Sequence, residues 1–392
     1  MGGNKFRVKV VLMTALVFST VFSGCFEEER EQLEEILVPP ININHPSVLP
    51  DWNNGEYHDY YETMNMLQEF QIDYPDLVNV FSIGESILGR DICCIRITNE
   101  KNNDEKYSCL IDGCIHGCEW EAGEACLYLA EYLLINQGRN GSISSLLNKS
   151  EIYIIPLVNP DGRQVDSRFN DNGIDLNRNF DVDFGRIRGS SMPLGVLFGQ
   201  IEIPYRMFPR LHNWFSWFPP FLTNSGRRPF SEPETQALRN TMKNLENNKF
   251  SFYLNCHTAV HTFNSPWICF KPPFEITSQE NKVNSAVIDW VVDNSEYENG
   301  KLHFEGLYYK ASGSAMDWCF KEYHIPSFSF EILSTDYEPG AGGGRHDHLV
   351  HWMKTTLPVF MYLVVNIENL HNWVTPDIQP LLPEGVPPEP LQ

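Results

Sequence analysis

Short apolar runs alternate along this chain with amphipathic segments, and this alternation strongly limits the folds open to it. Runs of strand length occupy 78–83, 91–98, 109–115, 151–157, 250–256 and 327–331. Helical periodicity occupies 60–71, 121–136, 232–247 and 281–293. Strands without polar alternation are typical of a sheet covered by helices on both faces. The pattern therefore predicts the α/β class, with a largely buried mixed sheet.

Polar residues follow several of the predicted strands at the point where each strand ends. His116 follows the run that ends at Ile115, and Asn159 follows the next strand along the chain. His257 and Glu331 close the last two strands. In open α/β sheets, ligands bind beyond the carboxyl ends of the strands. These side chains are therefore candidates for one shared site.

His116 and Glu119 lie three residues apart at the junction between a predicted strand and a predicted helix. Both side chains can point into one space, and an imidazole with a carboxylate provides two of the three ligands of a catalytic zinc site. A distant His commonly supplies the third ligand and leaves one position open for water. His257 is better placed for this than His261, because it leaves a strand end. Alone, the His-x-x-Glu pattern also fits an ordinary helix start.

Two arginines accompany several amides in the region beyond Asn159. Arg168 precedes Asn170 by two residues, and Arg178 lies between two Asn residues. In an acidic chain this arrangement suits a carboxylate ligand, because the guanidinium fork matches that anion. A surface ion pair would explain the same residues. The formal charge of −22 and the pI near 4.9 argue against nucleic acid, which needs a basic surface.

The N-terminal segment has the features of an export signal. Basic residues precede an apolar run at 10–22, and Ser23-Gly24-Cys25 follows. This pattern predicts a lipoprotein-type signal peptide over 1–24, lipidation of Cys25, and an exported, membrane-anchored protein at the cell surface. Plain signal cleavage and an uncleaved anchor are the alternatives. Residues 25–56 are acidic and then Pro/Asn-rich, which is typical of a tether.

An ordered set of motifs extends well beyond the His-x-x-Glu pair. They are His116-x-x-Glu119, Asn159-Pro160-Asp161-Gly162, Arg168-x-Asn170, Asp175-Leu176-Asn177-Arg178-Asn179-Phe180, Phe230-Ser231-Glu232-Pro233-Glu234-Thr235, His257, Tyr309-Lys310-Ala311-Ser312-Gly313 with Asp317-Trp318, and Phe330-Glu331. In this order they resemble the zinc carboxypeptidases of the carboxypeptidase A type, over residues 57–373. The resemblance implies a single catalytic domain with a mixed, mostly parallel central sheet flanked by helices, and one Zn²⁺ per chain.

The resemblance also implies roles for residues at the metal. His116, Glu119 and His257 would hold the zinc. Glu331 would be the general base that takes a proton from the attacking water and passes it to the leaving amine. Arg168 would stabilise the oxyanion that develops beside the metal.

Further implied roles concern the substrate, a peptide with a free C-terminal carboxylate. Asn177 and Arg178 would bind that carboxylate and restrict cleavage to the last residue. Tyr309 would close over the terminal residue and donate a hydrogen bond. Its neighbour Tyr308 is the alternative, and Tyr309 is preferred because it fits the Tyr-x-Ala-Ser-Gly spacing.

The pocket for the terminal side chain is predicted to be uncharged. Counted along the family motifs, Met316 would lie at its floor and Ile268 on its wall. Apolar or aromatic C-terminal residues are therefore expected. The predicted function is a zinc-dependent exopeptidase that removes the C-terminal residue of peptides. A peptidase of the same family acting on cell-wall or side-chain-modified peptides and an inactive peptide-binding lipoprotein are the alternatives.

Two segments depart from a minimal catalytic domain. An insertion at about 183–226 contains the aromatic residues Trp214, Phe215, Trp217, Phe218 and Phe221. Such a patch is expected to form an interface or a self-packed loop, and contact with the lipid surface is the further hypothesis. A Pro-rich tail occupies 374–392. Most of the ten Cys residues fall in apolar runs and are expected to pack as small hydrophobic side chains.

Overall fold

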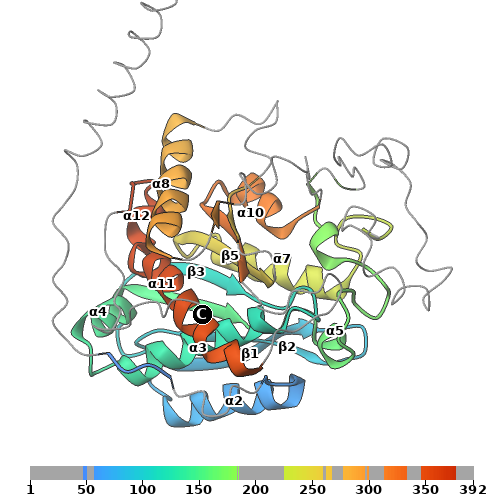
Figure 1. Cartoon of the computed structure of the whole chain (residues 1–392), viewed down its shortest axis with the longest axis horizontal. Helices are drawn as coiled ribbons and strands as arrows, with labels where there is room; N and C mark the ends of the chain where they lie inside the picture. The colour runs from blue at the N-terminus through green and yellow to red at the C-terminus, as the bar shows by residue number, and fades with distance from the viewer. Residues whose placement is uncertain are drawn as a thin grey trace, which may run out of the picture. The chain divides into compact units, whose positions relative to one another are not determined.

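The computed structural model describes residues 47–50, 57–182, 184, 225–258, 262–266, 277–295, 298–299, 313–332 and 346–376 (Figure 1). All of these residues lie in one compact unit that spans Ile43–Gln392. The predicted signal peptide with Cys25, most of the aromatic insertion, Tyr309 and Ile268 lie outside the described residues.

One mixed sheet forms the centre of the described structure. In chain order its strands are β1 (Val78–Glu85), β2 (Asp91–Ile97), β3 (Tyr107–Asp112), β4 (Ser150–Ile155), β5 (Phe250–Thr258), β6 (Thr262–Asn264), β7 (Glu298–Asn299) and β8 (Ser327–Ile332). They are arranged in the order β1-β2-β4-β3-β5-β8-β6-β7. The neighbours β4, β3, β5 and β8 are parallel, whereas β1 and β2 are antiparallel and β6 pairs antiparallel with β8. The mixed sheet with a parallel centre confirms the fold class.

Helices cover both faces of this sheet (Figure 1). They are α2 (Tyr60–Asp73), α3 (Trp120–Asn136), α4 (Gly141–Lys149), α5 (Pro160–Gln164), α7 (Pro233–Leu245), α8 (Ser278–Asn294), α10 (Ala315–Tyr323), α11 (His346–Val365) and α12 (Ile367–His371), with a 3₁₀ turn, η1, at Leu176–Arg178. Side chains of α2, α3, α4, α8, α11 and α12 form one apolar core with the sheet. Side chains of α7, α10 and η1 form a second core on the other face.

Helix α3 is the element that brings the predicted site to the sheet. Almost every side chain along it is buried, which is typical of a helix enclosed by other elements. Its N-cap is Glu119, whose side chain makes no capping hydrogen bond. The Glu119 carboxylate is therefore directed elsewhere, and the start of this buried helix fixes its position.

The turn between β3 and α3 differs from the sequence prediction. The apolar run 109–115 was predicted as one strand, but β3 ends at Asp112. A Cβ on Gly113 would lie 2.5 Å from the carbonyl oxygen of Ala122, and Cys114 has a φ of 51°. Close packing against α3 thus forces the chain out of the extended conformation before Ile115. His116 lies in the turn rather than at the strand tip.

Part of the predicted tether lies against the domain. The Asn136 side chain accepts a hydrogen bond from the Val48 amide and donates one to the Val48 carbonyl, both at 2.7 Å. Pro50 is buried and Leu49 packs against the core. Both backbone polar groups of Val48 thus bind α3, whereas an unstructured tether would leave them to water.

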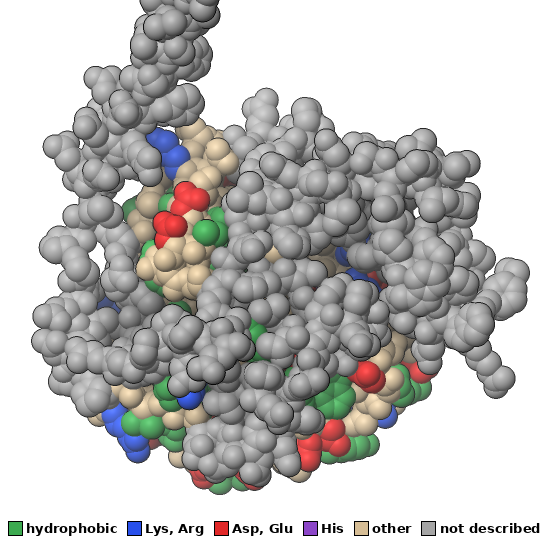
Figure 2. Space-filling model, in the orientation of Figure 1, with side chains coloured by type: hydrophobic (Ala, Val, Ile, Leu, Met, Phe, Trp, Pro, Cys, Tyr) green, Lys and Arg blue, Asp and Glu red, His purple; other side chains and the backbone are tan. Residues whose placement is uncertain are grey.

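The described cysteines are free, and Cys94, Cys109, Cys114, Cys126, Cys256 and Cys319 are buried. They pack as small apolar side chains, as expected. Among the described helices, none combines the length and apolar character needed to cross a membrane. Figure 2 shows basic, acidic and apolar side chains interspersed along the lower edge of the described surface, near α2.

Candidate active site

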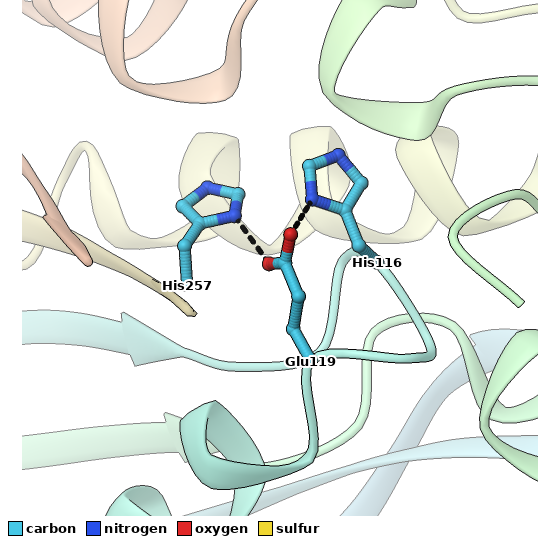
Figure 3. A group of neighbouring side chains, drawn as sticks. All are labelled: His116, Glu119 and His257. Atoms are coloured by element: carbon cyan, nitrogen blue, oxygen red, sulfur yellow. Dashed lines mark hydrogen bonds and ion pairs between the residues drawn. The ribbon is translucent and has the colours of Figure 1, made fainter. Parts of the chain in front are cut away.

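His116, Glu119 and His257 converge at the carboxyl ends of β3 and β5 (Figure 3). The Nδ1 atom of His116 lies 2.7 Å from Oε1 of Glu119, and the Nδ1 atom of His257 lies 2.7 Å from Oε2. The three ligand atoms lie within 4.8 Å of one another, and all three residues are buried. In the described part of the chain they form the one His/Cys/Asp/Glu group able to hold a metal ion.

The sheet register explains this convergence. Strands β3 and β5 are parallel neighbours, so their carboxyl ends meet at one edge of the sheet. His257 is the second-last residue of β5, and Glu119 is the N-cap of α3, the helix that follows β3. Gly117 permits the tight turn between the ligands, because a Cβ there would lie 2.1 Å from the Gly162 backbone. The Asn159-Pro160-Asp161-Gly162 motif thus supports the turn that carries His116.

Each imidazole is held through its Nε2 atom, so that its Nδ1 atom faces Glu119. Nε2 of His116 lies 3.0 Å from Oδ1 of Asp175, and Nε2 of His257 lies 2.5 Å from Oδ1 of Asn255. Supporting contacts of this kind fix the orientation of metal-binding histidines. The sequence interpretation gave neither Asp175 nor Asn255 a role. Two signals were present, since Asp175 begins the Asp-Leu-Asn-Arg motif and Asn255 shares a strand face with His257 at i, i+2.

The charge state of this cluster suits a divalent cation. Although burial opposes ionisation, the adjacent His116 and His257 hold the pKa of Glu119 well below its ordinary range. Burial likewise opposes ionisation of Asp175, but Arg168 and His116 hold its pKa well below the usual value. The cluster therefore presents an ionised carboxylate and two imidazole Nδ1 atoms, the N,N,O donor set of catalytic zinc sites. The residues present fit the metal.

Glu331 lies beside the metal-binding cluster on the neighbouring strand. The register of the parallel pair β5 and β8 places Glu331 directly opposite His257. Burial raises the pKa of Glu331 to about 7, and the nearby Glu119 carboxylate acts in the same direction. A carboxyl group with this pKa can exchange protons near neutral pH.

Arg168 reaches the same cluster from the loop after α5. Its Nη1 atom donates to Oε1 of Glu119 at 3.3 Å, and its Nε atom donates to Oδ2 of Asp175 at 3.0 Å. Its side chain stays 23% exposed. The guanidinium is therefore anchored by two carboxylates, while part of its surface stays accessible beside Glu119.

Asn177 and Arg178 lie in η1, next to the start of α10. Oδ1 of Asn177 accepts a hydrogen bond from the Ala315 amide at 2.8 Å, and its Nδ2 atom lies 3.1 Å from Nε2 of His257. Gly313 has a φ of 72°, and a Cβ there would lie 2.2 Å from the Arg178 carbonyl oxygen. Through Asn177, the structure thus brings η1 and Ala315, the first residue of α10, next to His257. Met316 itself is 4% exposed.

The loop that carries Arg168 is held by two glutamates of the Phe230–Thr235 motif. Nδ2 of Asn170 donates to Oε2 of Glu232 at 2.9 Å and to Oε2 of Glu234 at 3.2 Å. Burial raises the pKa of Glu234 to about 7. This motif lies beside the site without contributing a metal ligand, and its glutamates fix the Asn170 segment.

Ionisation of Glu234 is expected to lower the free energy of unfolding. Its carboxyl group keeps the proton up to about pH 7 in the folded chain, but releases it near 4.5 when unfolded. The folded state binds more protons between these values, so the free energy of unfolding falls as pH rises through this window, by about 2 to 3 kcal/mol. The free energy of unfolding, measured with urea on metal-free protein at pH 5 and pH 8, should show this pH-dependent fall in the original chain but not in Glu234→Gln. The exposed Glu246→Gln is the control, and an unchanged pH dependence in Glu234→Gln would contradict the assignment.

Comparisons with known proteins point to one family. The family model "Zinc carboxypeptidase" matches residues 63–341. The chain is 24% identical over 301 residues to carboxypeptidase A2 of Mus musculus, covering 73% of this chain and 65% of that protein. It is 24% identical over 327 residues to carboxypeptidase O of Bos taurus, covering 78% of this chain and 76% of that protein. The chain thus spans just under two thirds of the mouse relative.

Solved structures support the same fold. The structure of carboxypeptidase A from Helicoverpa armigera superposes with a TM-score of 0.60 at 21% identity, covering 82% of this chain and 75% of that one. Thrombin-activatable fibrinolysis inhibitor superposes with a TM-score of 0.61 at 20% identity, covering 81% of this chain and 75% of that one. The predicted α/β architecture is therefore shared with these proteins.

Proposed function

Because this chain belongs to the zinc carboxypeptidase family, we propose that it is a zinc-dependent exopeptidase that removes the C-terminal residue of peptides. The observation that carries the proposal is the convergence of His116, Glu119 and His257, with Glu331 opposite His257 on the next strand. This arrangement provides three metal ligands and a separate acid–base group at one edge of the sheet.

The positions of these residues support specific roles at the metal. His116, Glu119 and His257 would hold zinc, which would supply Lewis acidity to a water molecule and to the scissile carbonyl. Glu331 takes the proton from the attacking water and returns it to the leaving amine, which a pKa near neutrality favours. Arg168, anchored by Asp175, offers its guanidinium to the oxygen on which negative charge develops.

Recognition of the peptide terminus is assigned to η1 and α10. The positive charge of Arg178 lowers the pKa of Glu331. Arg178 is therefore close enough to act within the site formed by His116, Glu119, His257 and Glu331. A terminal carboxylate bound by Arg178 and Asn177 would place the last peptide bond at the metal. Met316 would form the floor of the pocket for the terminal side chain. Ile268 on the pocket wall and Tyr309, which would close over the terminal residue, are predictions for residues outside the described part of the chain. The uncharged Met316 and Ile268 favour apolar or aromatic termini.

A peptide panel tests this function. Purified protein with zinc should release the last residue from peptides ending in Phe or Leu faster than from matched peptides ending in Arg or Glu. Amidated versions of the same peptides should resist cleavage, because they lack the anion that Arg178 would bind. Released amino acids are measured by chromatography. Equal cleavage of free and amidated peptides would exclude the exopeptidase assignment, and preference for Arg or Glu would exclude only the pocket assignment.

Membrane anchoring at Cys25 is a separate part of the proposal. It is supported by the basic residues, apolar run and Ser23-Gly24-Cys25 at the start of the chain. In a bacterial host that processes lipoproteins, the full chain should fractionate with membranes, and mass spectrometry should find acyl groups on Cys25. Cys25→Ser should shift it out of the membrane pellet after detergent-free lysis, whereas Cys118→Ser should not. Membrane retention of the Cys25→Ser protein would leave the aromatic insertion 183–226 or an uncleaved anchor as the attachment.

A further inference from the structure

Asn255 contacts the imidazole edge of His257 that faces away from Glu119. We infer that Asn255, backed by Asp112, is a positioning residue that holds His257 in the one orientation and tautomer able to bind zinc through Nδ1. The inference rests on the zinc site of the proposed function and adds a residue that determines how strongly that site binds the metal.

The contacts form a buried chain behind His257. Oδ1 of Asn255 lies 2.5 Å from Nε2 of His257, and Nδ2 of Asn255 donates to Oδ1 of Asp112 at 2.5 Å. The other Asp112 oxygen accepts a hydrogen bond from the Tyr253 hydroxyl at 2.6 Å. Asp112, Tyr253 and Asn255 are each 0% exposed. Tyr253, Asn255 and His257 alternate along β5, so their side chains share one face of the sheet.

Asp112 fixes which way the Asn255 amide points. Both Asp112 oxygens already accept hydrogen bonds, so a rotated Asn255 would place its carbonyl oxygen against a carboxylate oxygen. The amide therefore presents its acceptor to His257. An acceptor at Nε2 stabilises the tautomer with hydrogen on Nε2, which leaves the Nδ1 lone pair for a metal.

A second amide competes for the same ring nitrogen. Nδ2 of Asn177 lies 3.1 Å from Nε2 of His257, and its orientation is set by the hydrogen bond from Ala315 to Oδ1. Asn177 thus presents a donor, which favours the opposite tautomer with hydrogen on Nδ1. That tautomer has no lone pair directed at the metal. The shorter contact from Asn255 is what opposes it.

The two zinc histidines are consequently anchored by different chemistry. His116 contacts the carboxylate of Asp175 directly, whereas His257 contacts a neutral amide that has the Asp112 carboxylate behind it. The Nε2 atom of His116 therefore has a charged hydrogen-bond acceptor, Asp175, that no intermediate residue has to orient. His257 depends on Asn255, because its other Nε2 neighbour is a donor.

Zinc affinity of the folded metal-free protein provides the test. Competition with a chromophoric chelator should show about 10- to 100-fold weaker zinc binding in Asn255→Ala than in the original chain. Cys256→Ala is the matched control, since Cys256 is buried on the same strand but packs into the core on the opposite face. The control should bind zinc within about 3-fold of the original chain, and circular dichroism should show that both variants are folded.

Exchanging the residue types at positions 112 and 255 separates an effect on the orientation of His257 from a general effect on packing. Asn255→Asp should weaken zinc binding, because it leaves two buried carboxylates facing one another with no hydrogen-bond donor between them. The double variant exchanges carboxylate and amide, restores every hydrogen bond of the chain, and should recover zinc affinity to within about 3-fold. With zinc bound, ¹H–¹⁵N spectra of His257 should show the Nε2–H proton in a strong hydrogen bond in the original chain and in the double variant, but not in Asn255→Ala.

The outcomes are distinguishable from failure of the zinc site itself. If the original chain binds no zinc, the proposed function fails. If it binds zinc and Asn255→Ala binds equally well, or no worse than Cys256→Ala, the positioning role of Asn255 is wrong.

Discussion

Glu331→Gln is expected to lower kcat by at least about 10²-fold while zinc content stays at one ion per chain. The substitution keeps the size of the side chain opposite His257 but removes the group that accepts the proton of the attacking water. Because the ligands are untouched, metal binding should not change. Steady-state kinetics on a peptide ending in Phe, with metal analysis of the same sample, measures both quantities.

Glu322→Gln is the matched control for this substitution. Glu322 is exposed on α10, so the same chemical change there should leave kcat within about 2-fold, as is usual for exposed positions outside special features. Turnover by Glu331→Gln at the original rate would remove Glu331 as the base. Loss of zinc in Glu331→Gln would instead show that the side chain supports the metal.

The second large effect is expected at a metal ligand. His116→Ala should lose zinc during purification and show no measurable peptidase activity, because one carboxylate and one imidazole remain in place of three ligands. The loss of affinity should exceed the 10- to 100-fold that removal of a supporting hydrogen bond typically costs. Zinc content by mass spectrometry and peptide release after addition of excess zinc measure the outcome.

His371→Ala provides the control for His116→Ala. His371 lies on α12 and contacts Tyr107, which begins β3 at the end of the strand opposite to the site. It should retain zinc and activity. Chelation of the original chain should abolish activity, and added zinc should restore it. Full activity of His116→Ala in the presence of chelator would remove the metal from the mechanism.

Local sequence patterns predicted much of the fold because the long elements carry strong periodicity. The segments 60–71 and 281–293 were predicted as helices, and the structure has α2 and α8 there within a few residues. Capping boxes at Asp59 and Thr277 explain why both helices begin where they do. Strands β6 and β7 were missed because they are only three and two residues long. Elements this short have no periodicity to detect, and pairing with neighbours defines them.

The body of α11 was not among the helices predicted from periodicity. From Leu357 to Val364 the helix is apolar on every side and packs into the core together with α3, so this part has no polar stripe that would mark a helix at the surface. In the sequence, the apolar run of a buried helix cannot be distinguished by periodicity from the apolar run of a buried strand. The end of β3 was misplaced for a related reason. Local propensity favours extension through Ile115, but packing of Gly113 against α3 decides the turn.

The family, the class of fold and the residue types available for a zinc site could all be inferred from the amino-acid sequence. Local spacing was sufficient to place His116 and Glu119 together, since both belong to one strand-to-helix junction. Folding of the whole sheet is what brings Glu119 and His257, 138 residues apart, into contact and places Glu331 opposite His257. It also decided which groups hold Nε2 of each imidazole. Strand order and register arise from packing across the whole sheet, so these contacts cannot be read from any short stretch of the chain.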